Sequence, residues 1–193
     1  MNRILYVFVC VVVLCSCSSK DKYAINGVVK ADEFQNQMVY MLDFNNGKAT
    51  LDSARVQDGK FHFEGAQPVP AVRILRLQGS DSMFPVLLPI VLENSDIDVT
   101  LGNIVLVEGT EQNDKMQDFL MAISHFTDQD FSQVTTEEMQ KQFQEIIISQ
   151  ILINKDNEVG VYIYKTYSPK LTEEQKSDLL SKVGRTFADK VIR

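Results

Sequence analysis

The sequence predicts an α+β protein, with an antiparallel β-sandwich or barrel-like domain at residues 23–109 and a small helical bundle at residues 110–193. Up to Gly109, short apolar segments that alternate with polar residues are separated by turn residues, which is the pattern of strands. After Gly109 the apolar residues recur three and four positions apart, which is the pattern of helices. Hydrophobic residues make up 45% of the 193 residues, and this share is enough to form a buried core.

The N-terminal residues carry the pattern of an export signal. Met1–Arg3 is positively charged, and Ile4–Leu14 is an uncharged apolar run. That run is shorter than the roughly 20 residues that cross a bilayer, but it has the length of a signal-peptide core. The run ends in Leu14-Cys15-Ser16-Cys17, which resembles the lipobox of bacterial lipoproteins.

We therefore expect a signal peptide at residues 1–16 and cleavage between Ser16 and Cys17. The Cys17 sulfur would be the acceptor of the lipid, with palmitate-type acyl chains that anchor the protein to a membrane. Residues 17–22 would form a polar tether. The alternative is an ordinary signal peptide cleaved nearby, with an incidental cysteine at this position.

All three cysteines, Cys10, Cys15 and Cys17, lie in this leader. After cleavage and lipidation no free thiol would be left, so we expect neither thiol–disulfide exchange nor a zinc site built from cysteines. We expect no cofactor and no metal. The net charge of −7 argues against binding to nucleic acid, which requires clustered Lys and Arg.

The strands follow from alternation and turn residues. Asn45-Asn46-Gly47 predicts one turn, and Asp58-Gly59 predicts a tight hairpin because this pair tolerates positive φ. About eight strands are expected by these criteria. Their ranges are Tyr23–Val29, Met38–Phe44, Leu51–Val56, Lys60–Glu64, Val72–Leu77, Phe84–Leu92, Ile97–Leu101 and Ile104–Val107.

Three or four helices are expected after residue 110. The first carries Met116 to Phe126, and the second begins at the capping box Thr135-Thr136-Glu137-Glu138. A shorter helix at Val159–Tyr167 would end before Pro169. A last helix would begin at Thr172 and carry one apolar stripe of Leu179, Val183, Phe187 and Val191.

Several segments together resemble a known family. They are Leu51-Asp52-Ser53-Ala54, Asp58 to Gly65, Leu92 to Ile97, and Val107 to Thr110 with Asn113. The ordered set is similar to a lipoprotein family of the Bacteroidetes that carries domain of unknown function 4369. In many members this module precedes a thioredoxin-like domain of the thiol–disulfide interchange or peroxiredoxin type. The resemblance implies that this domain would begin near Arg193, so we expect the chain to lack it and carry over no catalytic residue.

Six residues are candidates for a binding surface. They are Asp52, Ser53, Asp58, Gly59, Glu93 and Asn94. Asp52-Ser53 lies beside a predicted hairpin, and local hydrogen bonding of the turn is the alternative reading. Glu93-Asn94, followed by Ser95, Asp96 and Asp98, offers oxygen ligands for calcium, although a solvated turn fits the spacing better.

We expect a non-catalytic binding or accessory module in the cell envelope, facing the periplasm and anchored in the outer rather than the inner membrane. A thioredoxin-like envelope protein is a possible partner. Two alternatives remain open: a truncated or split member of a thiol–disulfide oxidoreductase family, and a hydrolase built on Asp52, Ser53, His62 or His125. The hydrolase requires these side chains to converge in a pocket.

Overall fold

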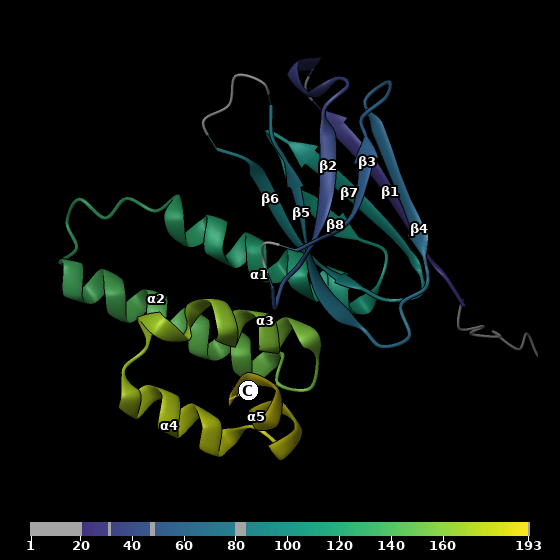
Figure 1. Cartoon of the computed structure of the whole chain (residues 1–193). Helices are drawn as coiled ribbons and strands as arrows, with labels where there is room; N and C mark the ends of the chain where they lie inside the picture. Colours follow the sequence, from purple (N-terminus) through teal and green to yellow (C-terminus); the bar gives the residue numbers. More distant parts are fainter. Residues whose placement is uncertain (1–20, 31, 47–48, 80–83, 193) are drawn as a thin grey trace, which may run out of the picture.

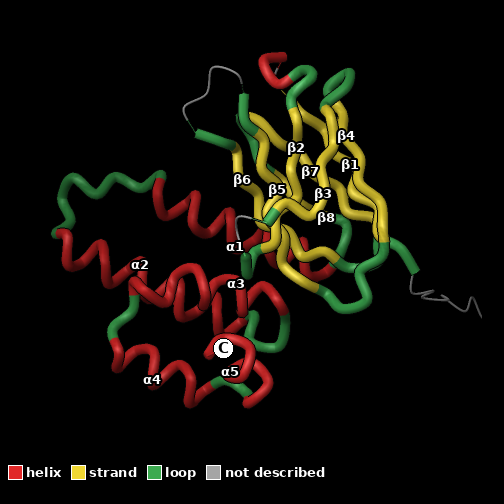
Figure 2. The backbone as a smooth tube through the Cα atoms, in the orientation of Figure 1, coloured by secondary structure: helices red, strands yellow, loops and turns green. Residues whose placement is uncertain are grey.

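A computed structural model describes residues 21–30, 32–46, 49–79 and 84–192, where eight strands come first and five α-helices follow. The predicted leader, with Cys10, Cys15, Ser16 and Cys17, lies outside the described residues. Figure 1 shows the helices gathered at one end of the β-domain, and Figure 2 shows the same division between strands and helices. The predicted α+β architecture, β first and then α, is confirmed.

The strands form two four-stranded sheets, so the described part of the β-domain is a sandwich rather than a closed barrel. The first sheet has the order β4-β1-β7-β8, and the second sheet has the order β3-β2-β5-β6. The strands are β1 (Tyr23–Lys30), β2 (Met38–Asp43), β3 (Thr50–Arg55), β4 (Lys60–Gly65), β5 (Ala71–Leu77), β6 (Val86–Leu92), β7 (Asp96–Gly102) and β8 (Leu106–Glu108).

One strand pair departs from the predicted antiparallel arrangement. β1 pairs with β4 antiparallel on one side and with β7 parallel on the other. The chain leaves the second sheet after β6 and re-enters the first sheet running in the same direction as β1. Alternation along a strand records which face is buried, but it does not record the direction of the neighbouring strand.

The tight turn predicted at Asp58-Gly59 is present, but the strands on either side of it do not form the predicted hairpin. Asp58 and Gly59 have φ of 50° and 69°, and Gln57 and Lys60 exchange two backbone hydrogen bonds of 2.9 Å across them. Beyond this bridge, β3 and β4 separate into different sheets. The turn thus connects the two layers, whereas the turn containing Asn45 and Asn46 does join a paired hairpin, β2 and β3.

Two predicted strands begin later than the sequence suggested. Phe84 precedes β6, which starts at Val86, because Pro85 has no N–H to donate to a ladder. Ile104 precedes β8, which starts at Leu106. Both Phe84 and Ile104 are exposed, and a strand assignment based on hydrophobicity alone had included them.

The five α-helices pack at one end of the sandwich. They are α1 (Glu111–Thr127), α2 (Thr136–Ile153), α3 (Glu158–Tyr167), α4 (Glu173–Lys182) and α5 (Arg185–Ile192). The predicted capping box is present: the Glu138 N–H donates to Thr135 Oγ1, and the Thr135 N–H donates to Glu138 Oε2. Of the described helices, none combines the length and hydropathy needed to span a membrane.

The single last helix predicted from Thr172 onward is instead two helices. Val183 is extended, with φ −100° and ψ 158°, and it ends α4 before Gly184. This break turns α5 so that Phe187 is buried and its ring meets that of Tyr164, with centroids 6.1 Å apart. The apolar residues that looked like one stripe therefore belong to two differently directed helices.

Helix α1 joins the sandwich to the helices through side-chain hydrogen bonds. Asn113 is fully buried, and its amide bonds both backbone groups of Val91 on β6, at 2.8 and 2.9 Å. The Val107 N–H donates to Gln117 Oε1 at 2.9 Å, and the Glu158 N–H donates to Gln112 Oε1 at 3.1 Å. These contacts fix α1 against β6, β8 and the start of α3.

Candidate functional site

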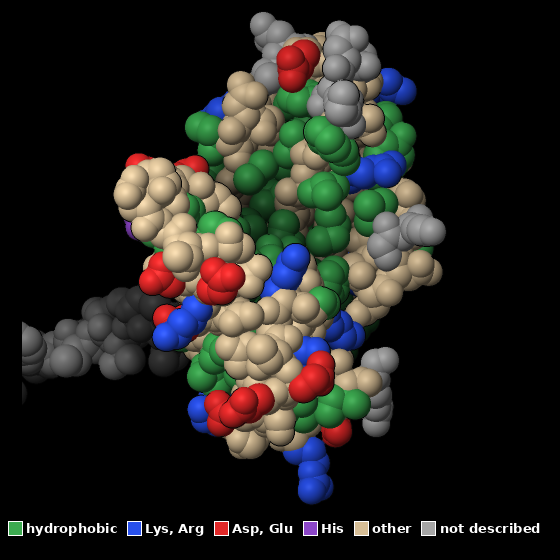
Figure 3. Space-filling view, turned by 90° about the vertical axis from the view of Figure 1, so that its left-hand side faces the viewer, with side chains coloured by type: hydrophobic (Ala, Val, Ile, Leu, Met, Phe, Trp, Pro, Cys, Tyr) green, Lys and Arg blue, Asp and Glu red, His purple; other side chains and the backbone are tan. Residues whose placement is uncertain are grey.

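The outer face of the second sheet is covered by helices over only part of its area. Val72 and Val91 form a cross-strand pair near the helices, and both are buried where α1 and α3 pack against β6 and β5. Further along the strands the same face is less covered. We call this surface the open face and define it as Met38 and Tyr40 of β2, Ile74 and Arg76 of β5, and Leu87 of β6. Figure 3 shows hydrophobic side chains gathered in a hollow between the β-domain and the helices.

Three residues form a row across the open face. Tyr40 is the cross-strand neighbour of Arg76, and Arg76 is the cross-strand neighbour of Leu87. The Arg76 guanidinium carbon lies 5.1 Å from the centroid of the Tyr40 ring, so the cation sits over the π face. Leu87 is 53% exposed. This row combines an aromatic ring, a cation and an exposed aliphatic side chain, the composition of protein interaction sites.

A second surface, an open groove of about 980 Å³, crosses the outer face of the first sheet. His62, Asn26, Asp98 and Glu108 are successive cross-strand neighbours along it. Ser53 contributes to its rim from β3. Charged residues of both signs line the groove, together with apolar residues such as Val28 and Leu106.

The hydrolase alternative required a serine, a histidine and a carboxylate within hydrogen-bonding reach. His62 Nδ1 lies 3.2 Å from Asn26 Oδ1, and its Nε2 lies 4.0 Å from Glu64 Oε2. Within the described ranges no hydrogen bond connects Ser53 with His62. His125 lies in a separate surface depression between α1 and α2, beside Gln142 and Glu145. The structure thus brings Ser53 and His62 to one groove but does not assemble a triad.

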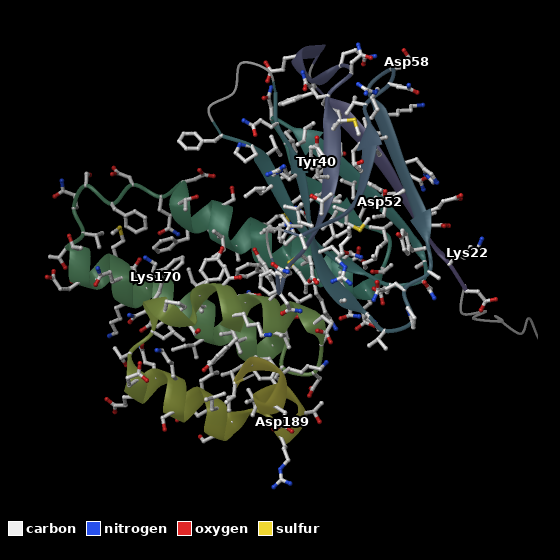
Figure 4. All side chains as sticks on the ribbon, in the orientation of Figure 1. Lys22, Tyr40, Asp52, Asp58, Lys170 and Asp189 are labelled. Carbon is white, nitrogen blue, oxygen red and sulfur yellow. The ribbon has the colours of Figure 1, made fainter. Side chains whose placement is uncertain are left out.

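Asp52 and Asp58 occupy different places on the sandwich. Figure 4 shows Asp58 at the end of the β-domain away from the helices and Asp52 nearer the middle of β3. The Ser53 N–H donates to Asp52 Oδ1 at 2.7 Å, so this carboxylate satisfies a neighbouring backbone N–H. Burial raises the pKa of the Tyr23 phenol, and the nearby Asp52 carboxylate raises it further. Asp58 and Gly59 form the exposed turn described above.

Glu93 and Asn94 lie far from these surfaces and hold parts of the fold together. The Gln67 N–H donates to Asn94 Oδ1 at 2.7 Å, and Gln112 Nε2 donates to Glu93 Oε2 at 3.2 Å. Both residues are half-buried. The turn was expected to be solvated, but through Glu93 it also contacts α1. Among the residues that the structure describes, no group of three or more His, Cys, Asp or Glu is arranged to hold a metal ion.

Sequence reasoning missed the open face. Val72–Leu77 showed Ile74 and Arg76 on the side opposite Leu75 and Leu77, which was the available signal. It did not show which residues of β2 and β6 lie beside them, because register between strands is a tertiary property.

The two packed sheets with helices docked at one end define a β-sandwich module with a helical extension. Residues 23–116 match the family model described as "Domain of unknown function (DUF4369)". The match covers the β-domain of this chain together with the first part of α1, which is just under half of the sequence. The match includes Asn113, and it confirms the predicted domain of unknown function 4369. No curated protein matches the chain.

Proposed function

We propose that this protein is a lipid-anchored, non-catalytic binding module of the cell envelope that holds a partner protein on its open face. The observation that carries the proposal is the incomplete covering of the second sheet. Helices bury Val72 and Val91 but leave Leu87 exposed and Tyr40 and Arg76 half-buried. Apolar patches left exposed on a folded domain are typical of interaction sites. A separately encoded thioredoxin-like protein is one partner that the family resemblance suggests.

The non-catalytic part of the proposal draws on the arrangement of the polar candidates. Ser53 and His62 line an open groove, where the His62 imidazole meets Asn26 and Glu64 rather than the serine. Nucleophilic catalysis by serine requires a base in contact with the hydroxyl. Binding of a partner requires no such contact, so it fits the arrangement better than hydrolysis.

The anchor is proposed from the leader sequence, and mass spectrometry tests it. The N-terminal fragment of the mature protein is expected to start at Cys17 and to carry diacylglycerol and fatty-acyl mass. Cys17→Ser is expected to abolish that mass, while Cys15→Ser retains it. A mature chain with an unmodified Cys17, or one that still contains Cys10 and Cys15, contradicts the anchor.

Site-specific photo-cross-linking in the native envelope tests the binding function. A photoreactive residue in place of Leu87 in the full-length protein is expected to give a discrete adduct that mass spectrometry can identify. Val28 is the matched control, because it is also an exposed aliphatic residue on a strand but lies on the outer face of the first sheet. No adduct at Leu87, or equal adducts at both positions, contradicts binding through the open face.

A further inference from the structure

Arg76 identifies the chemistry of the partner. We propose that the open face binds an apolar segment of a partner polypeptide, and that a carboxylate within this segment pairs with Arg76. The inference deepens the proposed function and rests on it. Two features of the surface support it: the guanidinium has no hydrogen-bond acceptor among the described residues, and apolar side chains surround it.

The guanidinium of Arg76 is only partly used within the fold. Its Nε is buried and has no hydrogen-bond partner among the described residues. Its contact with the Tyr40 ring fixes the position of the cation without satisfying the N–H donors. Arg73, three residues earlier, also has a buried Nε without a partner, but its terminal Nη1 forms an ion pair with Asp43 at 3.3 Å. Throughout residues 21–30, 32–46, 49–79 and 84–192, no comparable carboxylate reaches Arg76.

A carboxylate is the acceptor that best matches this donor. The planar guanidinium presents its N–H groups in a fork, which a carboxylate can accept with two parallel hydrogen bonds. The fork is already oriented by Tyr40, so little side-chain entropy is lost when a ligand arrives. The Nε N–H is shielded from solvent, so the two terminal Nη groups are the donors that an incoming carboxylate can reach.

The surroundings of Arg76 determine the rest of the ligand. Met38, Tyr40, Ile74 and Leu87 supply apolar and aromatic surface on both sides of the cation. Burial of this surface requires apolar side chains from the partner. A polyphosphate or nucleic acid would leave this apolar surface uncovered. The matching partner is therefore an apolar segment with one acidic residue.

Two dye-labelled synthetic peptides test the inference on the full-length protein held in lipid nanodiscs. Both carry the same leucine stripe of an amphipathic helix, one with Glu and the other with Lys at the centre, and empty nanodiscs give the background. Fluorescence anisotropy is expected to show about tenfold tighter binding of the Glu peptide, the size of one net charged hydrogen bond. Arg76→Glu is expected to reverse this preference, a result that loss of folding cannot produce.

Lys60→Glu is the matched control. It makes the same charge reversal on the outer face of the first sheet, so the preference for the Glu peptide should persist. Equal binding of both peptides to the wild type, or an unchanged preference in Arg76→Glu, overturns the inference. Displacement of the peptides by palmitate at a lower concentration also overturns it, because the face would then bind a lipid rather than a polypeptide. If one of these results is found but the Leu87 adduct still forms in the envelope, only the inference about Arg76 fails and the proposed function stands. If the Leu87 adduct is also absent, the proposed function and the inference both fail.

Discussion

Asn113→Leu is expected to lower the free energy of unfolding by about 3 kcal/mol, since it leaves two buried backbone groups without partners. β6 is an edge strand of the second sheet, and no strand of the described residues pairs with Val91 on its outer side. The Val91 N–H donates to Asn113 Oδ1, and Asn113 Nδ2 donates to the Val91 carbonyl and to Thr110 Oγ1. The side-chain amide thus takes the place of a neighbouring strand, in a fully buried position.

Urea or thermal denaturation followed by circular dichroism measures this effect. For a chain of this length a loss of about 3 kcal/mol corresponds to a fall in Tm of roughly 6–12 °C. Asp118→Ala is the matched control, because Asp118 lies on the exposed side of the same helix. Its effect should stay within about 0.5 kcal/mol. Equal stability of the two variants would show that Asn113 does not hold the edge of β6.

Asn113→Asp separates the hydrogen bonds from the packing. The shape is preserved, but an ionised carboxylate cannot donate to the Val91 carbonyl, and its burial raises the pKa of the introduced group. Its protonated form can donate to the Val91 carbonyl and accept from the Val91 N–H, although it lacks the second donor that the amide directs to Thr110 Oγ1. The folded-state pKa lies above the unfolded value, so stability relative to the wild type is greatest below the unfolded pKa and is lost as pH rises through the folded one. Denaturation at several pH values should show that the deficit shrinks in acid; a deficit independent of pH contradicts this account.

The sequence allowed prediction of the strands because each one buries alternate residues. Lys60–Glu64 is an example: Phe61 and Phe63 are buried, while His62 and Glu64 face solvent. Alternation did not allow prediction of the sheet to which β4 belongs, because the Asp58-Gly59 turn has the same local geometry whether its strands pair or separate. The parallel pairing of β1 with β7 was missed for the same reason, since it joins segments about 70 residues apart whose faces are equally apolar.

The candidate site was predictable only in part. Asp52 and Ser53 were predicted as surface binding residues because they lie beside a predicted hairpin. In the structure the Asp52 carboxylate accepts a hydrogen bond from the Ser53 N–H, which is the local bonding expected of a turn. The row of Tyr40, Arg76 and Leu87 depends on the register of three strands, which single-sequence periodicity does not contain. The exposure of this row also depends on where α1 and α3 pack against the second sheet. Hydrogen bonds of Asn113 and Gln112 fix the positions of these two helices. Local sequence patterns do not predict a surface that is formed by three or more secondary-structure elements.

Gly160→Ala is expected to destabilise the protein by about 2–4 kcal/mol, although alanine is the better helix former by about 1 kcal/mol. A Cβ at this position would overlap the carbonyl oxygen of Asn154 and lie 2.8 Å from its carbonyl carbon. Asn154 ends α2 and is buried, and Asn157 caps α3 by accepting from Gly160 and Val159. Both sides of the contact are therefore backbone, which moves only if the corner between α2 and α3 opens.

Gly184→Ala makes the same chemical change where a Cβ would meet nothing within 4 Å. This variant is expected to be neutral or to gain about 0.4–1 kcal/mol, because alanine reduces the conformational freedom of the unfolded chain. Chemical denaturation of the two variants should thus give effects of opposite sign from one substitution type. If Gly160→Ala is as stable as Gly184→Ala, the α2–α3 corner is loose, and the position of α3 beside the second sheet does not depend on this close backbone contact. If the expected difference is found, close packing at Gly160 fixes the helix that borders the open face.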